Sequence, residues 1–318
     1  MGIRLYKEPK LRNSLMFCGW PGIGNIGLFA IDTLRRALRA QEFGEIEPWH
    51  FFDPSRVIIE GGLLEDLEFP TNKFYFCRKA SLSGQRIKGR DLVFFIGEQQ
   101  PADGAARYAE GQKAYQMANL VLDVAKKFDC HRVYTSGAAV TQIHHTARPR
   151  VWAVPNSAKL IGEVEKYDNT VLMSEIEGRS DQGVITGLNG LLLGVAKKRG
   201  LEAICMMGEI PYYLQGAPWP YPKASKSVLE VLAKMLDIKI DLSELDGLAQ
   251  RVEENVEQFL ESLYSTEAVP PEIRDEIEKL RHAEPAEPGP ITEDEQKRIM
   301  EHIDELFDQG GWKDERHL

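Results

Sequence analysis

The sequence predicts a three-layer α/β/α fold with a mostly parallel central sheet, followed by acidic helices in the C-terminal quarter. Short apolar segments alternate with segments of helical periodicity through about the first 240 residues, the order expected of a parallel sheet covered by helices. The charge divides the chain of 318 residues at the same place. Residues 243–318 contain 22 acidic and 8 basic residues, net −14, which leaves 27 acidic and 31 basic residues, net +4, in residues 1–242.

Seven segments carry the strand signal, because each is short, apolar and bounded by polar residues or glycine. In chain order they are Leu15–Cys18, Val57–Glu60, Phe74–Arg78, Leu92–Ile96, Val133–Ser136, Val151–Val154 and Ala203–Met207. Four segments repeat apolar side chains at helical spacing, namely Ile26–Arg39, Ala105–Phe128, Val184–Arg199 and Ser225–Leu236. Residues 1–242 are therefore expected to form one core domain.

The C-terminal quarter predicts acidic amphipathic helices separated by proline. An S-x-x-D cap opens Ser243–Tyr264, whose apolar residues share one face, so residues 243–265 are expected to form a helix on the core domain. Residues 266–318 are expected to form an acidic helical tail with a proline-rich spacer at 283–290 and a last helix beginning at Thr292. The apolar stripes of these helices need a cover, either the parent domain or another subunit or partner.

Composition and charge argue against several classes of protein. A formal charge of −10 argues against nucleic-acid binding, which depends on Lys and Arg. The cysteines show no metal-ligand or disulfide spacing, so we expect buried thiols in a reducing cytoplasm at Cys18, Cys77, Cys130 and Cys205. Pro21 and four glycines interrupt the uncharged stretch Asn13–Ile31, which argues against a membrane span. We expect a cytoplasmic protein with no membrane contact, no metal and no cofactor.

A glycine-rich turn, GWPGIGNIG at residues 19–27, is the first candidate site. Gly22, Gly24 and Gly27 form a G-x-G-x-x-G pattern between an expected strand and an expected helix. In that position the backbone amides and the Asn25 side chain can donate hydrogen bonds to an anion at the helix N-terminus. The turn admits three interpretations: dinucleotide binding, binding of another small anion, or a purely structural tight turn.

The carboxyl ends of the strands form the second candidate site, because ligands bind at that edge of open α/β sheets. Four of the strands end in glycine, and two of these glycines are followed by Glu98 and Glu209. These carboxylates are candidates for acid–base work beside Thr135, Ser136 and Thr141. The alternative is that both carboxylates are structural and cap loops.

Two further segments carry side chains of interest. The segment TQIHHTARP contains His144 and His145, and adjacent histidines do not make a metal site, so we expect loop histidines held by the backbone. The segment PYYLQGAPWPYP places four aromatic residues among prolines, and these are candidate partner-binding residues: Tyr212, Tyr213, Trp219 and Tyr221. The alternative is a lid that packs on its own domain.

Glycines at spacings of four, three and four mark one face of an expected helix, at Gly183, Gly187, Gly190 and Gly194. Each glycine costs helix stability, so this pattern predicts that another part of the chain, or a second subunit, approaches the helix backbone closely.

Several segments together resemble the proteasome assembly chaperone two family, in its bacterial and archaeal branch. They are GWPGIGNIG, KKFDCHRVYTSGAAVT, HTARP, GVITGLNGLLLGVAKKRG and IPYYLQGAPWPYPKAS, in order over about residues 11–260. The resemblance implies a fold similar to nucleoside phosphorylases without their active-site chemistry, and it implies homo- or hetero-oligomers. In better-understood relatives it implies a role in assembling proteasome α-subunits.

The sequence therefore leads to two hypotheses of different kinds. The first is a non-enzymatic assembly chaperone or scaffold that works through protein–protein contacts and self-association. The alternative is a small-molecule binding protein or enzyme that uses the strand-end cleft. No G-x-S-x-G, H-E-x-x-H or Walker motif occurs, and this absence of common catalytic signatures favours the first.

Overall fold

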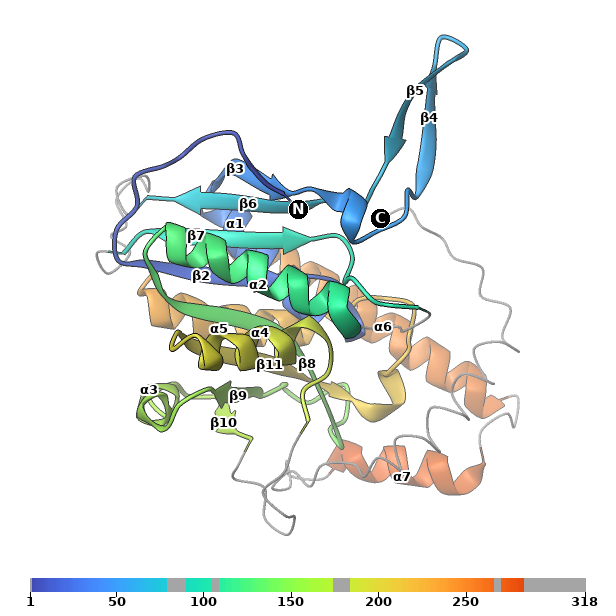
Figure 1. Ribbon diagram of the computed structural model, residues 1–318. Coiled ribbons are helices and arrows are strands. Elements are labelled where there is room, and N and C mark those ends of the chain that lie inside the picture. Colours follow the sequence, from blue (N-terminus) through green and yellow to red (C-terminus); the bar gives the residue numbers. More distant parts are fainter. Residues whose placement is uncertain (1, 79–89, 105–108, 174–183, 266–269, 283–318) are drawn as a thin grey trace.

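The structure is a computed structural model that describes residues 2–78, 90–104, 109–173, 184–265 and 270–282. Its centre is a nine-stranded sheet in the order β1-β3-β6-β7-β2-β8-β11-β9-β10 (Figure 1). The bounds are β1 (Ile3–Leu5), β2 (Ser14–Gly19), β3 (Gln41–Ile46), β6 (Asn72–Cys77), β7 (Leu92–Gly97), β8 (Cys130–Thr141), β9 (Val151–Pro155), β10 (Thr170–Leu172) and β11 (Glu202–Pro211).

The four central strands β7, β2, β8 and β11 run parallel, and the strands toward either edge join them by antiparallel pairs. This confirms the predicted α/β fold with a parallel centre. The flanking strands β1, β3 and β10 were not predicted. They are short or carry polar residues, as QEFGEI does in β3, so their apolar pattern is weak.

Helices cover both faces of the sheet (Figure 1). On one face α1 (Ile26–Ala37) packs beside α5 (Pro222–Leu236), and on the other α2 (Gly111–Lys127) packs beside α4 (Gly187–Lys198). Strand β2 shows how the sheet separates two cores, because Leu15 and Phe17 lie in one buried cluster and Met16 and Cys18 in the other.

Two further helices follow α5 among the described residues. Helix α6 (Ser243–Ser265) packs against α5 and buries three side chains of its predicted stripe, Leu245, Val252 and Val256, together with Leu260. Helix α7 (Pro271–His282) buries Ile277 against the same cluster. Within the described part of the tail the apolar stripes are thus covered by the parent domain, whereas the spacer at 283–290 and the helix predicted from Thr292 lie outside the described residues.

One element stands apart from the layers. Val57–Glu60 was predicted as a strand of the sheet, but β4 (Arg56–Glu60) pairs with β5 (Leu63–Glu68) in a separate two-stranded hairpin. The hairpin extends away from the body of the molecule (Figure 1). Short helical turns complete the described chain: η1 (Ile23–Asn25), η2 (Pro48–His50), η3 (Ala158–Leu160), α3 (Ile161–Val164) and η4 (Tyr212–Leu214).

Candidate functional site

The glycine-rich turn connects β2 to α1 and is shaped by close packing. A Cβ atom at Gly27 would lie 2.0 Å from the backbone oxygen of Ser136, so only glycine lets α1 approach β8 this closely. Gly24 has a φ of 57°, in the left-handed region that glycine adopts without strain. Asn25 follows with a φ of 48°, and its side-chain oxygen accepts a long hydrogen bond of 3.4 Å from the Gly22 amide. Close packing at Gly27 and the left-handed backbone at Gly24 thus explain why these two positions are glycine.

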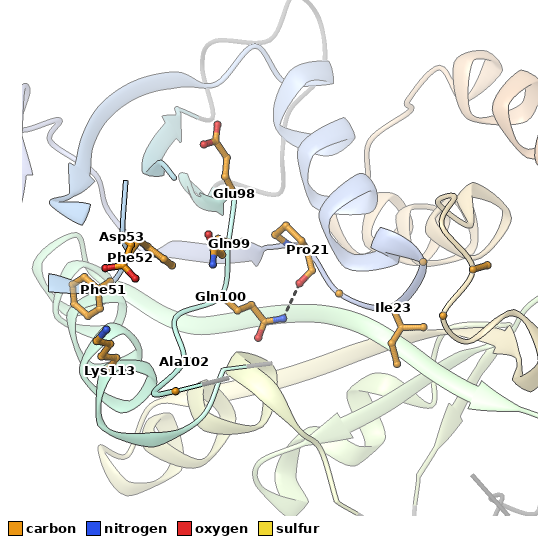
Figure 2. Close-up of a pocket in the computed structure, with 15 residues that line it drawn as sticks. Pro21, Ile23, Phe51, Phe52, Asp53, Glu98, Gln99, Gln100, Ala102 and Lys113 are labelled. Atoms are coloured by element: carbon orange, nitrogen blue, oxygen red, sulfur yellow. Dashed lines mark hydrogen bonds between the residues drawn. The ribbon is translucent and has the colours of Figure 1, made fainter. Parts of the chain in front are cut away.

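A pocket of about 570 Å³ opens beside this turn, between the ends of β2 and β7 and the loop before β4 (Figure 2). Among the predicted residues Gly22, Gly24 and Glu98 line the pocket. Other lining residues are Asp53, the acidic residue that dinucleotide binding at the glycine turn would require, and Gln100 and Lys113, which were not predicted as a site. Gln100 and Lys113 escaped prediction because they come from a loop and a helix and share no motif.

Gln100 fixes one wall of the pocket. Its side-chain amide donates to the Pro21 carbonyl at 2.7 Å (Figure 2), and its side-chain oxygen accepts from the Leu188 amide at 3.0 Å. The glycine turn is thus tied to the start of α4. Trp20 does not enter the pocket, because its ring is buried beside Phe95 at a centroid distance of 6.2 Å.

Glu98 and Glu209 do not form a pair. Strands β2 and β8 lie between β7, which Glu98 follows, and β11, which contains Glu209. Three strand spacings correspond to about 14 Å, too far for two carboxylates that share a proton or a substrate atom. The interpretation of paired carboxylates is therefore wrong, because the order of strands in the sheet is not their order in the sequence.

Each of the two carboxylates has a structural partner. Glu98 accepts a hydrogen bond from the Thr71 amide at 2.8 Å. Glu209 is fully buried and accepts from the Arg150 amide at 2.8 Å, the Arg150 guanidinium at 2.9 Å and the Trp152 indole at 2.9 Å. Donors on several sides hold the Glu209 carboxylate as part of an internal ion pair.

The hydroxyl residues predicted for the cleft lie inside the protein. Thr135, Ser136 and Thr141 are buried on β8, and none of them lines the pocket beside the glycine turn. Strand β8 is longer than predicted, and it continues past Gly137 to Thr141 in register with β11. The structure therefore brings together only the glycine turn and Glu98 from the predicted cleft.

The histidine segment anchors the C-terminal helices. His145 is buried, with Nδ1 2.8 Å from the Tyr213 hydroxyl and Nε2 3.0 Å from the Glu257 carboxylate on α6. Glu257 in turn pairs with Arg281 of α7 at 3.1 Å. Lys223 of α5 donates to the backbone oxygen of His145 at 2.8 Å. One loop thus connects α5, α6 and α7 through polar contacts.

Burial sets the charge of both histidines. It lowers the pKa of the His144 imidazole to about 4, and the neighbouring His145 ring, 4.1 Å away between centroids, acts in the same direction. Burial also lowers the pKa of His145, although Glu257 opposes the shift. Both side chains are therefore neutral at pH 7. No group of three His, Cys, Asp or Glu side chains in the described ranges is arranged to hold a metal ion.

The aromatic–proline segment packs inside its own chain. Tyr212, Tyr213 and Tyr221 are each no more than 6% exposed. Trp219 is half-buried and lies against Phe259 of α6 at 5.5 Å between ring centroids. This arrangement matches the alternative of a self-packed lid, and the three tyrosines are not available on the surface as anchors for a partner.

The glycine face of α4 has local explanations. Gly187 begins the helix with a φ of 73°, and a Cβ at Gly190 would meet the Ile185 carbonyl at 2.0 Å. A Cβ at Gly194 would meet nothing within 4 Å, so the expected close approach does not occur there. Gly183 lies outside the described residues. The cause is the tight turn before the helix rather than a distant neighbour.

The cysteines are structural. All four are buried and free, and burial raises the pKa of Cys77 and Cys205 to about 11. Burial also raises the pKa of Cys18 and Cys130 above the ordinary range for a thiol. Protonated, inaccessible thiols are poor nucleophiles.

The surface feature that sequence reasoning missed is the β4–β5 hairpin. Six of its apolar side chains are at least 40% exposed: Val57, Ile58, Ile59, Leu63, Leu64 and Leu67. A signal was present, because Gly61–Gly62 between two apolar runs is a strong hairpin pattern. No described helix is long and apolar enough to cross a membrane.

The chain is similar to proteins of one family along most of its length. A sequence model of the PAC2 family matches residues 16–260. An uncharacterized protein of Methanocaldococcus jannaschii is 27% identical over 273 residues, which cover 84% of this chain and 92% of the relative.

Solved structures show the same fold. PbaB of Pyrococcus furiosus, described as an archaeal proteasome activator, is 27% identical with a TM-score of 0.65, over 81% of this chain and 98% of PbaB. A PAC2 family protein of Streptomyces avermitilis is 22% identical with a TM-score of 0.61, over 80% of this chain and 98% of that protein. The resemblance seen in the sequence is thereby confirmed. Because the family match spans most of the 318 residues, the chain belongs to the PAC2 family.

Proposed function

We propose that this protein is a non-enzymatic assembly chaperone or scaffold that acts in the cytoplasm through contacts with other proteins, including copies of itself. The observation that carries the proposal is the β4–β5 hairpin, which presents six large apolar side chains to solvent. Soluble monomers rarely expose a contiguous apolar patch of several hundred Å² without using it as a contact surface.

A relative of this chain indicates which class of protein it contacts. PbaB, whose fold this chain shares, is described as an archaeal proteasome activator. By analogy the clients of this protein are subunits of a multi-subunit complex. The internal positions of Glu209, Thr135, Ser136 and Thr141 support the same proposal, because four of the residues predicted for a catalytic cleft are buried and do not line the pocket.

Affinity purification of the full chain from native lysate of its source organism tests this function. The expected result is a protein partner in fixed stoichiometry with this chain after size-exclusion chromatography. The Lys113→Ala variant is a matched control, since it alters the pocket and leaves the hairpin unchanged. A monomer at micromolar concentration, together with no stoichiometric partner, would contradict the proposal.

The pocket of about 570 Å³ favours a second candidate, a small-molecule binding function. Its size is in the range of ligand sites, and Gly22, Gly24 and Lys113 line it and could hold an anion there. Asn25, which was predicted for the same site, does not line the pocket. Asp53 and Glu98 line the same pocket and oppose an anion by their charge. A thermal-shift panel of nucleotides, nucleosides, dinucleotides and inorganic phosphate separates the two functions. A shift with one of them that Lys113→Ala abolishes would support binding, and no shift would count against it.

A further inference from the structure

The β4–β5 hairpin has two chemically different faces. Cross-strand partners share a face, and the register pairs Val57 with Leu67 and Ile59 with Leu64. Val57 and Ile59 are two apart on β4 and so share a face, and a register shift between Ile58 and Ile59 brings Leu64 to the same face of β5 as Leu67. The apolar face of the hairpin is therefore Val57, Ile59, Leu64 and Leu67, with no charged residue among them.

The charged face carries the remaining paired residues. The register also pairs Arg56 with Glu68, Ile58 with Asp66 and Glu60 with Leu63. Arg56 and Glu68 form an ion pair of 2.8 Å on this face. Such a division is typical of a strand pair that places one face against another surface and the other in water.

Nothing in the described chain covers the apolar face. Val57, Ile59, Leu64 and Leu67 are 56%, 68%, 67% and 43% exposed. The two strands pair only with each other among the described elements, and they extend away from the body (Figure 1). A two-stranded hairpin alone is at best marginally stable in water. A surface that packs on the apolar face would therefore stabilise this hairpin.

We propose that the apolar face of the hairpin is the contact through which two copies of this chain associate, face to face about a two-fold axis. This rests on the proposed function, in which the chain works in assemblies, and it names the surface for self-association. Two identical ribbons match in length and width, and the contact turns the charges of both copies outward. The projecting position of the hairpin keeps the two bodies apart (Figure 1).

The size of the face predicts a weak dimer. The four side chains leave on the order of 400 Å² exposed per copy, so the contact buries on the order of 800 Å² in total, less than the roughly 1,200–2,000 Å² of stable specific interfaces and in the range of weak, transient ones. Association is therefore expected at micromolar concentrations, and it depends on apolar packing rather than on charge.

Sedimentation velocity of the full chain, from about 1 to 100 µM to span a weak interface, tests the inference. The test variant is Ile59→Thr with Leu64→Thr, and the control is Ile58→Thr with Leu63→Thr. Both pairs replace one isoleucine and one leucine by an uncharged residue that strands favour, and they lie at adjacent positions on opposite faces. All four side chains are exposed, so both variants should keep the circular dichroism of the wild type.

We expect the wild type and the control to dimerise, and the test variant to dimerise at least tenfold more weakly. A wild type that stays monomeric, or a loss that is equal in both variants, would overturn the inference. If the test variant remains a dimer, the contact lies elsewhere and the inference also fails. In that last case a stoichiometric protein partner in lysate would leave the proposed function standing.

Disulfide trapping supplies a second measurement. An equal mixture of Ile59→Cys and Leu64→Cys proteins should form covalent dimers faster than a mixture of Ile58→Cys and Leu63→Cys, because only the first pair faces the second copy. The four native cysteines are buried and do not compete. Equal rates in the two mixtures would contradict a face-to-face contact.

Discussion

Glu209 shows how one residue of the sequence pattern acquires a structural role. Glu209 follows Met207–Gly208 at the end of an expected strand, which made it a candidate for acid–base catalysis. Its carboxylate is instead fully buried and accepts hydrogen bonds from Arg150 and Trp152. Removing one partner of a buried ion pair leaves the other charge without compensation, which costs far more than the pair itself contributes.

The Glu209→Gln variant should therefore lower the free energy of unfolding by about 3 kcal/mol. Glu98→Gln is the control, since Glu98 is exposed and accepts one hydrogen bond from the Thr71 amide, and its cost should stay below about 1 kcal/mol. Urea denaturation at pH 7 measures both. Equal losses in the two variants would contradict the structural role assigned to Glu209.

Two glycines in helices should respond to alanine with opposite signs. At Gly27 the new Cβ would lie 2.0 Å from the Ser136 oxygen, a backbone atom that cannot move freely, so Gly27→Ala should destabilise the protein by about 2 kcal/mol or more. At Gly194 nothing lies within 4 Å, and Gly194→Ala should stabilise α4 by about 0.5–1 kcal/mol. Thermal unfolding of the two variants checks the sign, and destabilisation at Gly194 would mean that its face is occupied.

The buried histidines make stability depend on pH. The pKa of His144 is about 4 in the folded protein, below its ordinary value of 6.5, so protons bind the unfolded chain more readily. The contribution of neutral His144 to the free energy of unfolding is complete above pH 6.5 and is lost as the pH falls toward 4. Between pH 7.5 and 5 we expect a loss on the order of 2 kcal/mol from this residue. The His144→Asn variant should show a correspondingly flatter dependence in denaturation experiments, and an unchanged slope would contradict the assignment.

Among the elements, α6 and α7 show what a polar network adds to an apolar stripe. The stripe predicted from Ser243 onward is buried at Leu245, Val252 and Val256, and the His145–Glu257–Arg281 chain joins both helices to the loop after β8. The periodicity of one helix can predict its apolar face. The polar chain was not predictable, because its three residues are far apart in the sequence.

Deleting residues 266–318 tests whether the α/β domain needs the tail. The deletion removes 16 acidic and 7 basic residues, so the formal charge changes from −10 to −1. We expect the sheet and α6 to remain folded, with some loss of stability because Ile277 and the Arg281–Glu257 pair are removed. Amide hydrogen exchange of the truncated chain measures this. Loss of protection in the central strands would show that the tail is part of the core.

At the scale of the whole molecule, the sequence predicts layers better than it predicts neighbours. The central strands and the four main helices follow from apolar runs and helical periodicity. The order β7-β2-β8-β11 does not follow from them, and for this reason Glu98 and Glu209 were wrongly brought together. Sequence patterns indicate which side chains are buried, but they do not determine which strands are neighbours in the sheet.

The candidate site was predictable only in part for the same reason. The glycine turn is a local motif, so Gly22 and Gly24 were found, and they line the pocket. Gln100 and Lys113 reach that pocket from a loop and a helix, which no local spacing reveals. The hairpin was locally encoded by Gly61–Gly62 between apolar runs, but its separation from the main sheet is a property of the tertiary structure.

We propose that this PAC2 protein works through protein contacts rather than through chemistry in a cleft. Native mass measurement of the full chain, alone at micromolar concentration and after capture from lysate, tests it most directly. We predict a dimer of the 35.9 kDa chain in buffer and a complex of fixed stoichiometry with another protein in lysate. A mass of one chain under both conditions would contradict it.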